Sequence, residues 1–147
     1  FYFGAWPSYG TCPTDGCLDS GPTHFSAAPA VSVDTDSQYI YVAKHGWGEI
    51  HRCELPDCAD DTDDILVTDT IPLSVAVDET TLYFAAYDLF EINSAPPPGI
   101  FKCPLDGCGT DEPEIVREAL SPYAIAVNER RLFYTDVEQG TVTSLAK

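Results

Sequence analysis

All six cysteines of this 147-residue chain fall into three pairs of the form Cys-x4-Cys. This spacing, with proline, aspartate and glycine in the intervening turn, brings two β-carbons within reach of a disulfide bond. Paired thiolates can also hold zinc, but zinc pairs usually have about two to four intervening residues and must converge in fours. We therefore expect a disulfide within each pair: Cys12–Cys17, Cys53–Cys58 and Cys103–Cys108.

The cysteine pairs and the composition together indicate where the protein works. Disulfides persist in oxidising compartments, so we expect an extracellular or cell-envelope location. With 24 acidic and 7 basic residues, the net charge of −17 repels phosphate backbones, which argues against a nucleic-acid partner. No apolar run approaches the roughly 18 residues of a membrane span. The acidic surface fits solubility, with binding of a cationic partner as the alternative.

Residues able to catalyse a reaction are few. The histidines are His24, His45 and His51, and the chain has no Gly-x-Ser-x-Gly, His-Glu-x-x-His or glycine-rich phosphate loop. His51 occupies the position that Phe101 has in the next repeat, so we expect an ordinary strand residue there rather than a catalyst. These observations predict no catalytic site and no bound cofactor.

One acidic cluster has the oxygen ligands that calcium requires. It lacks the glycine and the distal glutamate of an EF-hand loop, so a solvated acidic turn is the preferred interpretation. Calcium binding stays open as the alternative. The cluster contains Asp57, Asp60, Asp61, Asp63 and Asp64.

The elements that must position these residues form a repeat. Pro29, Pro72 and Pro122 each precede an alternating apolar run, which gives intervals of 43 and 50 residues. Aromatic and β-branched residues with a period of two predict four strands per unit. Such units of roughly 40 to 50 residues are typical of β-propeller blades. The predicted strands are residues 30–33, 39–43, 48–53 and 64–68, then 73–77, 82–86, 99–103 and 114–117, then 123–127, 132–135 and 140–143.

The repeat predicts an all-β chain made of two complete and two partial four-stranded antiparallel blades. We expect a partial blade of three strands at 1–27, complete blades at 28–70 and 71–120, and a second partial blade of three strands at 121–147. Because propellers close with about four to eight blades, other strands must complete the ring. They would come from the remainder of the same polypeptide or from another copy. Two copies that shared their partial blades would make about six blades, but three strands from each side would overfill a four-stranded blade.

Several motifs resemble the YWTD repeats of low-density lipoprotein receptor-like propellers. They are residues 122–128 (Pro-Tyr-Ala-Ile-Ala-Val-Asn), 132–136 (Leu-Phe-Tyr-Thr-Asp) and 99–107 (Gly-Ile-Phe-Lys-Cys-Pro-Leu-Asp-Gly). Phe133 and Tyr134 stand where that family has Tyr-Trp, and the cysteine pairs are not a hallmark of the family. NHL-type propellers are similar at this level. The resemblance, which covers almost the whole chain, implies a six-bladed ring that acts as a binding or scaffolding module.

Aromatic residues recur in the loop between the second and third strands of three successive units. In a propeller these loops lie together on one face, near the mouth of the central channel, where they could stack on sugar rings or hold a side chain of a protein partner. The alternative is that they pack between adjacent blades. This candidate binding face contains Trp6, Tyr9, His45, Trp47, Tyr87 and Phe90.

Two classes of function remain open. The first is a non-enzymatic extracellular module for binding, adhesion or scaffolding, with a protein or carbohydrate ligand on the loop face. The second is a propeller hydrolase, lactonase or lyase with its metal or catalytic site in the central channel. Asp34, Asp78 and Asn128 end the first strands of three units, and we expect these side chains to cap turns rather than to bind a metal.

Overall fold

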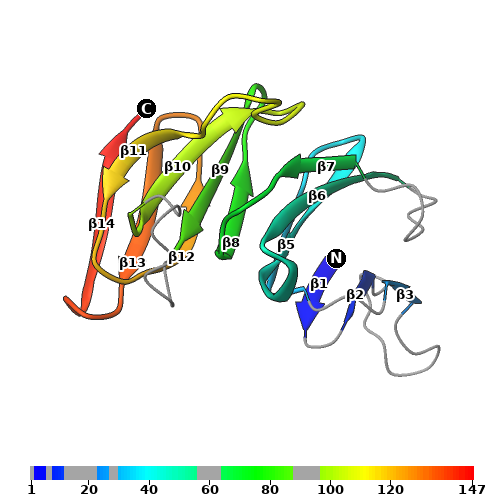
Figure 1. The fold of residues 1–147 in the computed structure, drawn as a ribbon, viewed down its shortest axis with the longest axis horizontal. Helices are drawn as coiled ribbons and strands as arrows, with labels where there is room; N and C mark the ends of the chain where they lie inside the picture. Colours follow the sequence, from blue (N-terminus) through cyan, green and yellow to red (C-terminus); the bar gives the residue numbers. More distant parts are fainter. Residues whose placement is uncertain (1, 6–7, 12–22, 27–29, 56–63, 88–96) are drawn as a thin grey trace.

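The structure, a computed structural model, describes residues 2–5, 8–11, 23–26, 30–55, 64–87 and 97–147. For residues 2–5, 8–11 and 23–26 it describes the backbone alone. These parts of the chain form four antiparallel sheets that follow one another along the molecule (Figure 1). No helix in the described residues has the length and apolar character that crossing a membrane requires.

Each sheet is a meander in which strands that are consecutive in sequence lie side by side. We number the sheets as blades. Blade 1 contains β1 (Tyr2–Ala5), β2 (Ser8–Thr11) and β3 (Thr23–Ser26). Blade 2 contains β4 (Ser32–Thr35), β5 (Tyr39–Lys44), β6 (Glu49–Glu54) and β7 (Asp64–Val67). Blade 3 contains β8 (Pro72–Val77), β9 (Thr81–Ala86), β10 (Gly99–Pro104) and β11 (Glu114–Glu118). Blade 4 contains β12 (Pro122–Val127), β13 (Arg131–Asp136) and β14 (Thr141–Ala146).

This arrangement confirms the predicted fold class, an all-β propeller segment of two four-stranded blades between two three-stranded ones. The residue limits predicted for the four units stay a prediction. The one helical element described is a short 3-10 turn, η1 (His45–Trp47), between β5 and β6.

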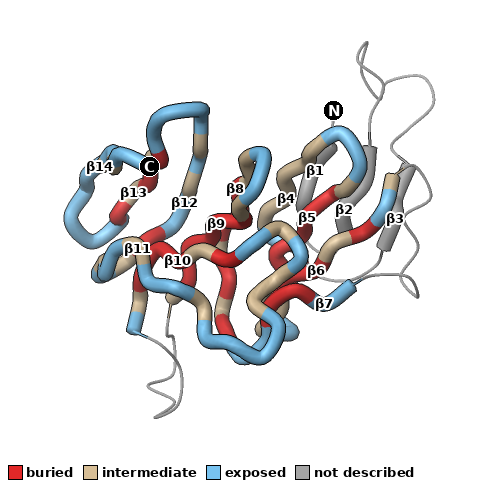
Figure 2. The backbone as a smooth tube through the Cα atoms, turned by 90° about the horizontal axis from the view of Figure 1, so that it is seen from above, coloured by how far each residue is buried: buried red, intermediate tan, exposed pale blue. Residues whose placement is uncertain are grey.

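Blades 2, 3 and 4 pack face to face, and the apolar side chains between them form the core. Figure 2 colours the buried positions of these blades red. Phe84 and Phe101 of blade 3 stack with their ring centroids 5.3 Å apart, in a cluster that includes Tyr41 and Ile50 of blade 2. Five of the six residues of β5 and of β9 are buried, because a neighbouring blade covers each face of these sheets. Fully burying a side chain such as Phe84 stabilises the fold by roughly 1.5–3 kcal/mol.

Two serines tie the innermost strands of successive blades together. The hydroxyl of Ser32 on β4 accepts a hydrogen bond of 3.2 Å from the N–H of Val75 on β8, and the hydroxyl of Ser74 accepts one of 3.2 Å from Ile125 on β12. The two serine oxygens are 3.4 Å apart and 42 residues apart in sequence. Each tie satisfies a backbone donor at the inner edge of the next blade, where an unpaired N–H is costly.

In blades 2, 3 and 4, the turn after the first strand is capped by a carboxylate or an amide, although the prediction for Asp34 is wrong. Asp78 and Asn128 accept hydrogen bonds from the amides two and three residues later, as predicted. In blade 2 the residue that does so is Asp36. Asp34 lies within β4, and its carboxylate accepts the N–H of Val77 from the next blade at 2.8 Å. The first strand begins and ends two residues later than the sequence pattern indicated.

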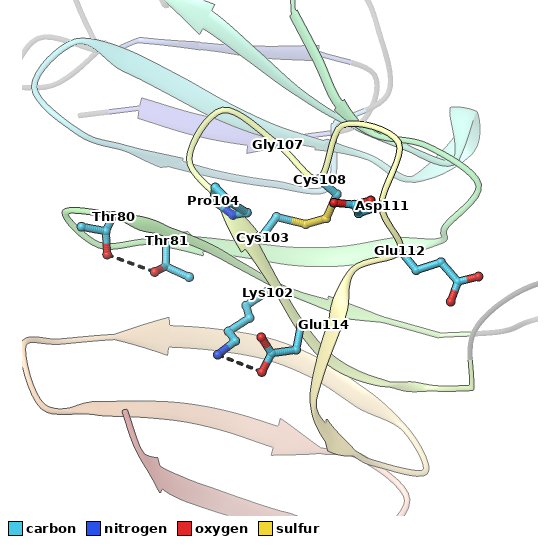
Figure 3. A pocket seen from close by; sticks show the side chains of 10 residues that line it. All are labelled: Thr80, Thr81, Lys102, Cys103, Pro104, Gly107, Cys108, Asp111, Glu112 and Glu114. Carbon is cyan, nitrogen blue, oxygen red and sulfur yellow. Dashed lines mark hydrogen bonds and ion pairs between the residues drawn. A yellow bond between two sulfur atoms is a disulfide. The ribbon is translucent and has the colours of Figure 1, made fainter.

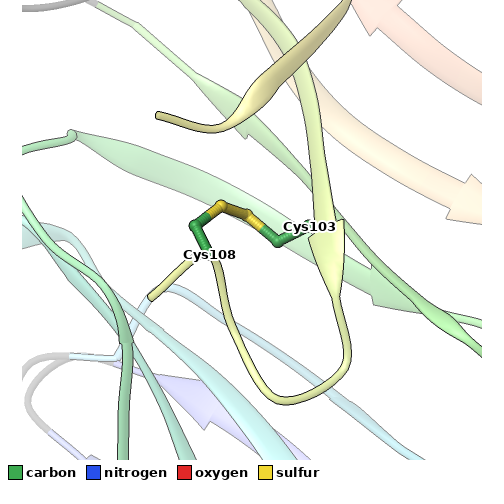
Figure 4. The surroundings of a disulfide bond; sticks show 2 residues. All are labelled: Cys103 and Cys108. Atoms are coloured by element: carbon green, nitrogen blue, oxygen red, sulfur yellow. A yellow bond between two sulfur atoms is a disulfide. The ribbon is translucent and has the colours of Figure 1, made fainter. Parts of the chain in front are cut away.

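The structure contains the Cys103–Cys108 disulfide, which closes a loop between β10 and β11 with the two Cα atoms 5.1 Å apart (Figure 4). Cys53 is also disulfide-bonded. Its predicted partner Cys58 lies outside the described residues, as do Cys12 and Cys17. The pairing at those two sites stays a prediction.

The turn at Asp36 predicts how stability depends on pH. Burial by itself would raise the pKa of Asp36, but hydrogen bonds from the Gln38 and Tyr39 amides and the Tyr41 hydroxyl, with the charge of Arg52, outweigh burial and hold it below its usual value. A lowered pKa means that this carboxylate stabilises the fold above the unfolded-state pKa of about 3.9, and that the contribution is lost as the pH falls through the folded-state pKa.

We expect Asp36→Asn to lower the free energy of unfolding at neutral pH by about 1 kcal/mol, because the accepted hydrogen bonds lose their charge. In urea titrations the difference from the unmodified protein should shrink as the pH falls through the carboxylate range, since Asp36 is then protonated too. A difference that stays constant over this range would contradict the assignment of the effect to charge.

Candidate functional site

The best-described part of the predicted binding face is the turn between β5 and β6. It consists of η1, which carries His45 and Trp47, and Gly48, which ends it in the left-handed conformation at φ 74°. The N–H of Gly48 donates to the carbonyls of Lys44 at 3.1 Å and His45 at 3.3 Å. A residue with a β-carbon at Gly48 would be strained, so the glycine is required for this turn.

A second connection holds the turn in place. Thr70, between β7 and β8, donates its N–H to the carbonyl of Gly48 at 3.1 Å. A β-carbon at Gly48 would lie 2.8 Å from the Thr70 carbonyl oxygen, so the two backbones approach as closely as glycine permits. The turn that carries Trp47 is therefore fixed to the rest of blade 2.

Trp47 is the most accessible large side chain on this turn, with 56% of its surface exposed. The ammonium of Lys44 lies 5.0 Å from the centre of the Trp47 ring, within the range of a cation–π interaction. The imidazole of His51 lies beside the indole, with the ring centres 6.1 Å apart. These two neighbours fix the indole while leaving much of its surface accessible to a partner.

Beneath Trp47, three polar side chains form a hydrogen-bonded chain. Lys44 is 1% exposed, and its Nζ lies 3.1 Å from Nδ1 of His51. Nε2 of His51 lies 2.7 Å from a carboxylate oxygen of Glu49. An ammonium only donates, so Nδ1 must accept and Nε2–H must donate to Glu49. A buried charge is costly unless it is hydrogen-bonded, and this chain extends from the Lys44 ammonium to the Glu49 carboxylate.

A hollow of about 230 Å³ lies next to the turn, where the innermost strands of three blades begin. Nδ1 of His45 is buried and has no hydrogen-bond partner among the described residues. The two serines of the inter-blade ties contribute to the wall, so the hollow has a fixed frame. Its lining residues are Val31, Ser32, His45, Leu73, Ser74, Tyr123 and Ala124.

The structure places the predicted binding-face residues unevenly. His45 and Trp47 share one turn, with His45 at the hollow and Trp47 exposed beside it. Tyr87 follows β9, is half-buried, and donates its N–H to the carbonyl of Ile71. Tyr9 lies in β2, where only the backbone is described, and Trp6 and Phe90 lie outside the described residues. Their part in a common face stays a prediction.

The calcium alternative is largely outside the described residues, where Asp57, Asp60, Asp61 and Asp63 lie. Asp64 begins β7, and its carboxylate pairs with Arg52 at 2.9 Å. In the described part of the chain, no three His, Cys, Asp or Glu side chains are grouped as a metal site requires.

A second hollow, of about 390 Å³, borders the Cys103–Cys108 loop of blade 3 (Figure 3). Lys102 and Glu114, which line it, form an ion pair of 3.0 Å. The pair occupies the same register position as Arg52 and Asp64 in blade 2, because in each sheet these residues face one another across the third and fourth strands. The ion pair thus recurs between blades, and the hollow lies at the cysteine-loop end of blade 3 rather than at the turn that carries Trp47.

Lys44 and Glu49 were not among the residues predicted for the binding face. Blade 3 has Ala86, Gly99 and Phe101 where blade 2 has Lys44, Glu49 and His51. The signal was the presence of three polar residues together at positions that are small or apolar in the next repeat. Comparing the repeats position by position would have identified the group.

Comparisons with known proteins give no close relative. No protein-family profile matches the chain, and no curated protein is detectably similar in sequence. A solved structure entitled "Crystal structure of Nidogen/Laminin Complex" is similar with a TM-score of 0.45 and 13% identity, over 99% of this chain and 88% of that one. The four sheets alone establish the fold class. The assignment to YWTD or NHL repeats stays a prediction.

The polar chain under Trp47 can be tested with His51→Phe, which introduces the residue of the next repeat. Losing one acceptor and one donor next to the buried Lys44 ammonium should lower the free energy of unfolding by about 1–3 kcal/mol. Urea unfolding followed by circular dichroism measures this loss. Tryptophan emission should also change, and the change should be absent in a Trp47→Phe background. Unchanged stability and emission would show that the chain does not support the indole.

Proposed function

We propose that this protein is a non-enzymatic β-propeller module of the extracellular space or cell envelope, which binds a protein or carbohydrate partner on its loop face. The observation that carries the proposal is the half-exposed indole of Trp47, held between Lys44 and His51 at the edge of a hollow. An aromatic face of this kind offers a large contact area to a sugar ring or to an apolar side chain.

The rigidity of the turn supports a binding role. Side chains and loops that are ordered only on binding reduce affinity by the entropy they lose. Trp47 is already placed by the Gly48–Thr70 contact and by its two neighbours, so little further ordering is needed. The adjacent hollow would accept a side chain or a ring substituent of the partner.

The cysteine chemistry supports the proposed location. The Cys103–Cys108 disulfide and the bonded state of Cys53 are what an oxidising compartment produces. The surface charge of the chain, −17 overall, suits a soluble module in a saline medium.

Observations on the first strands favour binding over the enzyme alternative. A channel metal would need carboxylate or amide oxygens that converge from several blades. The described candidates are engaged otherwise: Asp34 accepts a backbone N–H of the next blade, and Asp78 and Asn128 cap turns. Asp78 is also paired with Lys147.

Completion of the ring is part of the same proposal. β1 and β14 are edge strands of their sheets, and Val142 on β14 is 75% exposed. Open, apolar strand edges and faces are usually covered in soluble proteins. We therefore propose that further strands, from the same polypeptide or another copy, cover them in a ring of about six blades.

The loop-face proposal predicts that Trp47→Ala weakens partner binding while the melting temperature stays unchanged. The partner is first identified with the unmodified protein on immobilised panels of extracellular proteins and of glycans, which separate the two ligand classes. Ile65→Ala is the matched control, since Ile65 is 55% exposed on the outer strand of the same blade. Equal binding by Trp47→Ala and the control would exclude this turn from the interface.

A further inference from the structure

The Cys103–Cys108 loop contacts blade 2, although it belongs to blade 3. The N–H of Cys108 donates to the carbonyl of Leu66 on β7 at 3.2 Å. A guanidinium nitrogen of Arg52 on β6 donates to the carbonyl of Leu105 at 3.2 Å. These two hydrogen bonds join the loop to the two outer strands of the preceding blade.

Packing reinforces the hydrogen bonds. Leu105 and Cys108 lie against the core cluster between blades 2 and 3, which contains Leu66 and Cys103. Gly107 has φ +94°, and a β-carbon there would be only 2.6 Å from the Leu66 carbonyl oxygen. The loop backbone thus approaches β7 at a distance that only glycine allows. By contrast, a β-carbon at Gly109, another residue with positive φ, would meet no atom within 4 Å.

A local staple and an inter-blade clamp differ in what the disulfide holds. A staple restricts its own hairpin, whereas a clamp also holds the loop in the shape that fits a neighbouring sheet. Here one end of the bond, Cys103, is buried in the inter-blade core, and the other end, Cys108, donates to blade 2. Because the disulfide already restricts the loop, the loop loses less conformational entropy when it docks on blade 2.

We propose that the Cys103–Cys108 disulfide is an inter-blade clamp, which holds residues 105–108 on β6 and β7 and so keeps the outer strands of blade 2 closed against blade 3. In blade 4, Leu145 stands at the register position of Cys103, since both face the leucine at the second position of the preceding strand. The clamp is therefore a property of particular blades rather than of the whole repeat.

Hydrogen exchange of the intact chain tests the clamp, because its effect should appear in a different blade from the disulfide. In a Cys103→Ala/Cys108→Ala variant, the amides of β7 should exchange roughly tenfold faster, on the scale of losing one or two hydrogen bonds. The amides of β13 in blade 4 serve as the reference. Faster exchange confined to residues 103–108, or an equal increase in β7 and β13, would overturn the proposal.

A glycine pair tests the same contact with the disulfide left intact. Gly107→Ala should push the loop away from Leu66 and accelerate exchange in β7. Gly109→Ala is the matched control, because it carries similar backbone strain but meets no neighbour. Equal β7 exchange in the two variants would show that the contact with blade 2 does not hold the strand, and would overturn the clamp.

Discussion

The packing of each sheet face on the next sheet is the interaction on which the rest of this structure depends. A single meander of four short strands cannot bury both of its faces, and five of the six residues of β5 and of β9 are buried only because neighbouring blades cover them. In β13, by contrast, every second residue is buried and the residues between them are exposed or half-buried. Leu132 and Tyr134 belong to the core that blade 4 shares with blade 3. The serine ties at the inner strands then set the position of one blade relative to the next.

This packing separates two roles along the length of the strands. β6 begins next to the turn that carries Trp47 and ends near Cys53, so Trp47 and Cys53 lie at opposite ends of the same strand. The turn at one end carries the exposed Trp47, on which the proposed binding depends. At the other end, the Cys103–Cys108 loop is engaged with the neighbouring blade. The binding site we propose therefore lies at the opposite end of the strands from the loop that joins blade 3 to blade 2.

The sequence was sufficient to predict the fold class, because alternating apolar residues and evenly spaced turns are local signals. It was less reliable for single residues. Asp34 was expected to cap a turn that Asp36 caps, since the end of the strand is decided by pairing with β5 rather than by the apolar run alone.

The candidate site was predictable only in part. The aromatic residues of the loops predicted a binding face. His45 and Trp47, two residues of that predicted face, lie on one turn. The chain of Lys44, His51 and Glu49 beneath the indole was not predicted, because it depends on side chains from two strands that meet only in the folded sheet. Likewise, the docking of the Cys103–Cys108 loop on Leu66 joins residues of different blades, which no local pattern reveals.

The most direct test of this account is the hydrogen exchange of two inner-strand amides, those of Val75 and Ile125, measured by NMR. Each donates to a serine of the preceding blade. Ser32→Ala should accelerate exchange at Val75, and Ser74→Ala at Ile125, while the Thr81 amide, which donates to Asp78 within its own blade, should not change. If neither serine variant alters its partner amide, the blades are not tied at their inner strands, and the account of their packing is wrong.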